Sequence, residues 1–162
     1  MTTGQIAIYG LCFQAGAIIA SALGVAAIIA WNIRIARRRA TLDILLSEQS
    51  HEITIKERTK FVSLKKEGNL TKWALPENNK TDELETIRSV LNRYELVAIG
   101  IERSALDGQL YKNWCRTTLV NDWIALKPFV MEIRANNKVP TIFCEFEALA
   151  ASWANAGERP HV

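Results

Sequence analysis

The chain has 162 residues, which is enough for one ordinary domain but short for two. Its formal net charge of +3 comes from one cluster, Arg34, Arg37, Arg38 and Arg39, because the rest of the chain carries 16 Lys and Arg against 17 Asp and Glu. A nucleic-acid binder is expected to carry a basic face on its folded domain. This charge distribution therefore argues against DNA or RNA as a partner.

The first predicted element is a membrane-spanning helix. Residues 6–31 form a run of 26 residues without Asp, Glu, Lys, Arg or His. A bilayer core about 30 Å thick needs roughly 20 helical residues, so this run is long enough to cross with some tilt. A buried core helix rarely continues so far without a charge, and a signal peptide would carry positive charges before its apolar run. We predict an uncleaved N-terminal anchor comprising residues 1–36.

The arginine cluster that begins at Arg34 predicts how the anchor is oriented. Flanks rich in Lys and Arg stay in the cytoplasm. The N-terminus should therefore face outward, and the region after the cluster should be cytoplasmic. Trp31 precedes the cluster, at a position where an interfacial aromatic side chain is expected.

Small residues recur at every fourth position within the predicted span. Gly16, Ala20 and Gly24 lie along one helix face, and such a stripe lets two helix backbones approach closely in lipid. The alternative is that Gly and Ala are simply common in membrane helices. Gln14 lies elsewhere on the helix, and a lone amide in lipid favours a partner. The stripe predicts a homo-oligomer held together through the membrane helix.

Residues 37–156 are predicted to form an all-α cytoplasmic domain of about five helices, followed by a flexible tail at 157–162. The anchor helix should continue to about residues 47–51, because neither Gly nor Pro interrupts it. A second, more polar helix is expected at Glu52–Glu67, with Gly68 at its C-terminus. Its four lysines alternate with glutamates, which favours a solvated face over a contact with lipid headgroups: Lys56, Lys60, Lys65 and Lys66.

Residues 69–80 have the composition of a loop, with Pro76 and a Trp73 that is expected to be exposed. The strongest helix signal follows it. Thr81 is a suitable N-cap, and Asp82 and Glu83 place negative charge in the first turn. Apolar residues then repeat at three- and four-residue spacing: Leu84, Ile87, Leu91, Tyr94, Ala98 and Ile101.

Three further helices are predicted. Asp107 can cap the first of them, and Pro128 either kinks the second or marks its start. The third follows Pro140. The residues expected to face inward are, in chain order, Leu110, Trp114 and Leu119; Trp123, Leu126, Val130 and Ile133; and Ile142, Phe146, Leu149 and Trp153.

We expect neither enzyme activity nor a bound metal or cofactor. The sequence has no CxxC, no HExxH and no glycine-rich phosphate loop. Cys115 and Cys144 are isolated and are interpreted as small core residues. Glu145 and Glu147 are two positions apart, which places them on different faces of a helix, whereas acid–base catalysis needs a converging pair.

Four segments carry a family resemblance: ARRRATLDILL at 36–46, IRSVLNRYELVAIGI at 87–101, LDGQLYKNWCRTTLVNDWIALKPFVMEIR at 106–134 and FCEFEALAASW at 143–153. The chain resembles an uncharacterised bacterial and prophage-encoded family of small proteins with one N-terminal membrane helix and a helical cytoplasmic region. The resemblance implies the architecture but no activity. It also implies the bacterial inner membrane as the location.

The preferred hypothesis is a non-enzymatic, membrane-tethered interaction module. Its expected partners are the lipid bilayer, further copies of the chain and an unidentified cytosolic protein. The alternative is a prophage- or defence-related membrane effector, which either excludes superinfecting phage or perturbs the membrane. That alternative depends on the family resemblance alone.

Overall fold

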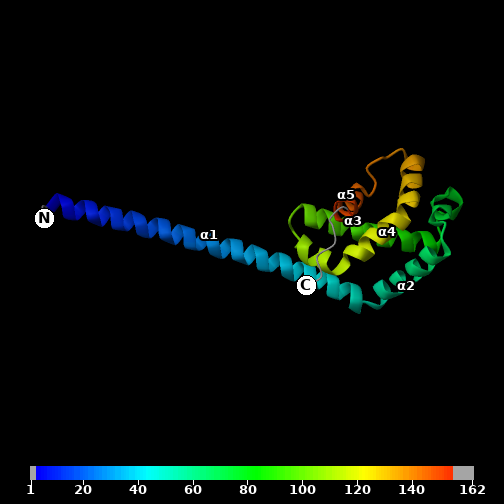
Figure 1. The fold of residues 1–162 in the computed structure, drawn as a ribbon, viewed down its shortest axis with the longest axis horizontal. Helices are drawn as coiled ribbons and strands as arrows, with labels where there is room; N and C mark the ends of the chain where they lie inside the picture. Colours follow the sequence, from blue (N-terminus) through cyan, green and yellow to red (C-terminus); the bar gives the residue numbers. More distant parts are fainter. Residues whose placement is uncertain (1–2, 155–162) are drawn as a thin grey trace. The chain divides into compact units, whose positions relative to one another are not determined.

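The structure is a computed structural model that describes residues 3–154, with side chains from residue 13 onward. The predicted tail at 157–162 and the last two residues of the predicted domain lie outside the described residues. Five α-helices and two short 3-10 helices make up the secondary structure of the described part, which includes no strand (Figure 1). The predicted all-α fold class is confirmed.

The chain forms two compact units, Met1–Arg37 and Arg38–Val162. The long helix α1, Thr3–Ser50, contributes its apolar part to the first unit and its last turns to the second. Its uninterrupted course to Ser50 confirms the predicted extension beyond the apolar run. Helix α2 occupies Glu52–Glu67 as predicted. It ends at Gly68, whose φ of 76° is a conformation that side chains with a Cβ rarely adopt.

The segment predicted as a loop contains two 3-10 helices, η1 at Leu70–Ala74 and η2 at Pro76–Asn78. Trp73 was expected to be exposed, but it is half-buried against the core, and the ammonium of Lys72 lies 4.8 Å from its ring centroid. Leu70 is buried in the core. The segment folds because these two side chains bury apolar area that a solvated loop would leave in water.

Helix α3, Asp82–Glu102, begins where the capping pattern predicts. The Thr81 hydroxyl accepts a hydrogen bond from the backbone N–H of Leu84 at 3.3 Å. The predicted stripe faces the core, with only Ile101 half-buried at its end. The buried residues of α3 are Leu84, Thr86, Ile87, Val90, Leu91, Tyr94, Val97 and Ala98.

Two predicted helices are in fact one, α4 at Gly108–Asn137, with Pro128 inside it. Asp107 caps its N-terminus as predicted. Pro128 cannot donate to the carbonyl of the preceding turn, which normally breaks a helix. Here Pro128 itself is exposed, while Leu126, Phe129 and Val130 beside it are fully buried. Their packing holds the helix together across the missing hydrogen bond.

Trp114 was predicted to face inward, but it is 65% exposed. The buried stripe of α4 runs instead through Tyr111, Leu119 and Asp122, at spacings that keep one helix face toward the core. Trp114 is three positions after Tyr111 and lies to one side of that stripe. Tryptophan is apolar, but the register of α4 places position 114 beside the buried stripe and not within it.

Helix α5, Cys144–Ala154, lies against α3 and α4 (Figure 1). It begins after Phe143, which has a left-handed φ of 57°, so the helix starts later than the position after Pro140. Phe146 stacks on Tyr94 with ring centroids 4.7 Å apart and meets Trp123 edge-on at 5.0 Å. These contacts place one aromatic ring from each of α3, α4 and α5 in a single cluster.

We predict that Leu91→Ala destabilises the protein by about 2–5 kcal/mol, because Leu91 is fully buried and its truncation leaves a cavity. The measurement is denaturant unfolding of the full chain in detergent, followed by circular dichroism. Leu96→Ala is the matched control on the same helix, since Leu96 is 68% exposed and should change the free energy of unfolding by less than about 0.5 kcal/mol. Equal effects of the two changes would contradict the orientation of α3.

Candidate functional site

The apolar part of α1 is exposed along its described length. The helix includes an 18-residue window with a mean hydropathy of 2.0, and none of that window is buried. Large apolar side chains such as Phe13, Leu23 and Ile28 face outward on it. By length and composition, α1 is able to cross a membrane.

The predicted packing stripe is open on the surface of α1. Gly16, Ala20 and Gly24 are all exposed, and a Cβ added to either glycine would meet nothing within 4 Å. Ser21 satisfies its own hydroxyl by donating to the carbonyl of Ala17 at 2.8 Å. The small residues therefore make no close side-chain contact within the described chain.

The four predicted juxtamembrane arginines have different environments. Arg34 and Arg39 are exposed, and Arg37 is half-buried. The Nε of Arg38 donates to the carboxylate of Asp107 at 3.2 Å. Arg38 thus takes part in the packing of the helical unit. Trp31, next to the cluster in sequence, is 64% exposed.

Asp107 connects the end of α1 to the start of α4. Its carboxylate accepts from the backbone N–H groups of Gln109 and Leu110 and so caps α4. Its own N–H donates to the hydroxyl of Thr41, a buried residue of α1, at 2.8 Å. The hydrogen bond from the Leu110 N–H, aided by Arg38, lowers the pKa of Asp107 and keeps it ionised. One side chain therefore satisfies a helix end and an interhelical contact together.

A second carboxylate, Asp122 on α4, is completely buried. It accepts from Lys65 Nζ at 2.6 Å and from Arg58 Nη1 at 2.5 Å, both from α2. The hydroxyl of Tyr94 on α3 donates to the same carboxylate at 2.8 Å. A buried charge is tolerated only when paired and hydrogen-bonded, and these three donors meet that requirement.

The Tyr94 hydroxyl of this Asp122 cluster is kept protonated by its surroundings. Burial, together with the negative charge of Asp122, raises the pKa of Tyr94, so Tyr94 remains a neutral donor. The side chain of Asp122 has no exposed surface on which a substrate could reach it. The cluster therefore holds three helices together and does not have the access that a catalytic base needs.

Two further carboxylates cross-link helices. Glu57 on α2 accepts from Arg93 at 2.9 Å and from the Ser89 hydroxyl at 2.7 Å, both on α3. Glu95 on α3 accepts from the backbone N–H of Phe146 at 2.7 Å, in the first turn of α5. A carboxylate at that position satisfies an end group of the helix and complements its dipole.

The residues considered for chemistry are not assembled into a reactive group. Cys115 and Cys144 are half-buried free thiols, and burial raises the pKa of Cys115 to about 11, which makes its thiolate scarce at neutral pH. Glu147 pairs with Arg134 at 2.7 Å, while Glu145 takes no part in that pair. Among the residues that the structure describes, no group of three His, Cys, Asp or Glu side chains is placed to hold a metal ion.

Residues 11–153 match the model of a family described as a domain of unknown function (DUF4760). The chain belongs to the DUF4760 family. Because the match begins within the apolar run of α1 and ends in α5, the DUF4760 region includes most of the candidate span as well as the helical unit. No curated protein and no solved structure matches the chain at a significant level.

The Asp122 cluster was not predicted, although the DUF4760 chain contains a signal for it. Asp122 continues the apolar stripe between Leu119 and Leu126 at helical spacing. An acidic residue at a core position requires buried donors, so its position alone predicts a polar cluster. The donors themselves could not be identified, because Lys65 has the sequence context of a solvated lysine.

We predict that Asp122→Asn destabilises the protein by about 3–5 kcal/mol, because the fully buried carboxylate is the charge that compensates the half-buried cations of Lys65 and Arg58. Thermal and denaturant unfolding of the full chain would measure the loss. Asp82→Asn is the control, since Asp82 pairs with Lys60 on the surface and should contribute at most about 1 kcal/mol. A loss at Asp122 no larger than that at Asp82 would contradict the structural role of the cluster.

Proposed function

We propose that this DUF4760 protein is a membrane-anchored, non-enzymatic adaptor that presents its helical unit to a cytosolic protein. The observation that carries this proposal is the composition of α1. Its N-terminal part exposes an apolar surface suited to lipid, and the last turns of the same helix supply Thr41 and Leu45 to the packed unit. One helix thus contributes both the anchor and part of the core.

The proposed location is the bacterial inner membrane, with the N-terminus outside and the helical unit in the cytoplasm. The orientation is supported by Arg34 and Arg39, which are exposed just after the apolar run, because positive flanks stay in the cytoplasm. The bacterial origin is supported by the resemblance to prophage-encoded proteins.

The partner surface is supported by apolar side chains that the helical unit leaves exposed. Trp114 on α4 is 65% exposed, and Leu96 on α3 and Ile124 on α4 are exposed to a similar extent. Tryptophan is strongly enriched among the residues that contribute most to protein–protein binding. A non-enzymatic role is supported by Asp122, Glu57 and Glu95, which all serve as helix–helix links.

Self-association through the span is part of the proposal. It is supported by the small-residue face at Gly16, Ala20 and Gly24, where all three residues are exposed and a Cβ added to either glycine would meet nothing within 4 Å. Close helix approach in lipid depends on such small side chains, since water exclusion does not drive association there. An oligomer would bring several copies of the helical unit to one partner and so raise the effective affinity.

For the topology, a fluorescent reporter that folds only in the cytoplasm, fused after Val162, should be active. An alkaline phosphatase reporter at the same position, which needs the periplasm, should be silent. Replacing Arg37, Arg38 and Arg39 with Glu should weaken the preference for a cytoplasmic C-terminus, because it removes most of the positive charge that holds this flank in the cytoplasm. Activity of the periplasmic reporter alone would refute the orientation and, with it, the cytosolic partner.

For the oligomer, Gly24→Ile should lower the signal in a membrane two-hybrid assay several-fold, because the branched side chain separates two helices that pack through this face. Val25→Leu is the control, since position 25 lies about 100° further around the helix and would meet lipid. Equal signals from both variants and the unmodified chain would show that the stripe is only compositional.

The alternative function is a prophage- or defence-related effector that perturbs the membrane. Its support is the family resemblance. The span offers little for an ion pathway, because it carries no charge and the Ser21 hydroxyl is bonded within its own helix. Overexpression separates the two functions, since an effector of this kind should collapse the membrane potential whereas an adaptor should leave it intact.

A further inference from the structure

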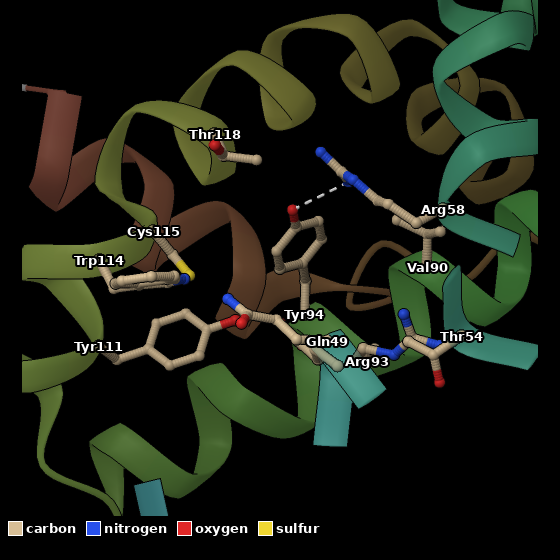
Figure 2. Close-up of a pocket in the computed structure, with 11 residues that line it drawn as sticks. Gln49, Thr54, Arg58, Val90, Arg93, Tyr94, Tyr111, Trp114, Cys115 and Thr118 are labelled. Carbon is tan, nitrogen blue, oxygen red and sulfur yellow. Dashed lines mark hydrogen bonds between the residues drawn. The ribbon is translucent and has the colours of Figure 1, made fainter. Parts of the chain in front are cut away.

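A pocket of about 190 Å³ lies among the last turn of α1 and helices α2, α3 and α4 (Figure 2). It is next to the Asp122 cluster, since Arg58 and Tyr94 contribute to both. A cavity of roughly 150 Å³ is large enough for benzene, so this pocket can hold a small organic molecule. The wall includes charged and uncharged polar groups as well as the indole of Trp114.

The hydroxyl of Tyr111 is an unpartnered polar group in this pocket. Tyr111 is fully buried, and no described group makes a well-formed hydrogen bond to its hydroxyl. The Cys115 thiol is close enough to affect the pKa of Tyr111, but a thiol is only a weak hydrogen-bonding group. Figure 2 shows this hydroxyl directed toward the middle of the lining side chains. Buried hydroxyls are nearly always hydrogen-bonded, because water otherwise solvates them better. A donor held this way is suited to an acceptor atom of a bound molecule.

Glu48 is a second polar group of the pocket without a direct ion-pair partner. Its carboxylate is half-buried in the pocket wall, and burial raises its pKa despite the attraction of Arg93 and Arg58. No ion pair within 4.0 Å joins Glu48 to either arginine or to any other described side chain. The carboxylate of Glu48 and the guanidinium groups of Arg58 and Arg93 thus line one pocket without forming a direct ion pair.

Both arginines have donors to spare. Arg58 uses Nη1 for Asp122, and Arg93 uses Nη2 for Glu57. A guanidinium has five N–H donors on three nitrogens, so these pairs do not exhaust either group. The pocket therefore presents guanidinium and hydroxyl donors together with one carboxylate acceptor.

We propose that this pocket binds a small zwitterion, an α-amino acid. Its ammonium group donates to Glu48, and its carboxylate accepts from the Tyr111 hydroxyl and from Arg58 or Arg93. Three cations, Arg58, Lys65 and Arg93, are balanced by three carboxylates, Asp122, Glu57 and Glu48, so the wall favours a ligand without a large net charge. The side chain of the amino acid would contact Val90 and Trp114.

The site goes beyond the adaptor role and holds for either proposed function. Glu48 belongs to α1, whereas the other named groups belong to α2, α3 and α4. A ligand bound between them would fasten the last turn of α1 to the helical unit. Binding of a ligand in the pocket would therefore raise the free energy of unfolding of the helical unit.

The test uses the full chain in lipid nanodiscs and adds each of the common amino acids singly. Isothermal titration calorimetry measures affinity, and thermal unfolding is followed by circular dichroism. At least one amino acid should bind and, at a concentration of roughly 100 times its Kd, raise the unfolding midpoint by about 5 °C. The corresponding amine and the corresponding carboxylic acid, each lacking one charge, should bind at least about tenfold more weakly.

Two variants assign this binding to the pocket. Glu48→Gln should lower the affinity at least about tenfold by removing the charge that meets the ammonium group. Tyr111→Phe should lower it several-fold while leaving the midpoint of the free protein unchanged or higher, since it removes a buried hydroxyl that makes no well-formed hydrogen bond. Glu52→Gln is the control on exposed surface, where Glu52 pairs only with Lys56, and should leave the affinity unchanged.

The proposal is overturned if no amino acid binds, or if binding is the same in Tyr111→Phe as in the unmodified chain. It is also overturned if the one-charge analogues bind as tightly as the amino acid. Free nucleobases serve as a comparison set, because Trp114 could stack on a flat ring. If nucleobases bind with the same dependence on Glu48 and Tyr111 and amino acids do not, the ligand is a heterocycle and not a zwitterion.

Discussion

The buried carboxylate of Asp122 is the constraint on which the packing of the helical unit depends. A charge without exposed surface is stable only if donors reach it from several sides. Here α2 supplies Arg58 and Lys65, and α3 supplies the hydroxyl of Tyr94. A shift of α2 or α3 by one turn, about 5.4 Å, would withdraw these donors. Apolar contacts alone tolerate such a shift better, because several helix registers bury similar apolar area. The Asp122 cluster therefore selects one of these registers.

The same strategy recurs at the helix ends, where carboxylates satisfy backbone groups of a neighbouring helix. Asp107 caps α4 and also meets Thr41 and Arg38 from the end of α1. Glu95 receives the first N–H groups of α5. Helix ends leave unpaired backbone N–H groups that are costly to bury. Because these carboxylates accept hydrogen bonds from those groups, the helix ends can pack tightly without leaving them unpaired. The position of α5 and that of the last turns of α1 thus depend on single acidic side chains.

The sequence was informative wherever a local rule decides the structure. Thr81, Asp107 and Gly68 marked helix ends correctly because capping depends on a side chain and its own backbone. The unbroken α4 was missed because Pro128 breaks helices by local rules, and only the burial of the neighbouring turns overrides them. The inward orientation of Trp114 was wrong for a related reason. The choice between Tyr111 and Trp114 depends on which face of α4 meets α3, which no local pattern encodes.

The sequence does not predict which polar side chains of α2 contact other helices. Its lysines alternate with glutamates, a pattern typical of a solvated face, and Lys56 with Glu52 fits that interpretation. Lys65 does not, since it reaches the buried Asp122, and Lys60 binds Asp82 and Glu83 at the start of α3. Long flexible side chains can lie in water or span to a neighbouring helix with the same sequence around them. Whether such a lysine is solvated or forms an interhelical ion pair depends on an acidic residue far away in the chain. The spacing of that residue relative to its apolar neighbours predicts that it is buried. A charged residue inside an apolar stripe is therefore the sequence feature that predicts interhelical ion pairs, and in this DUF4760 protein Asp122 is that residue.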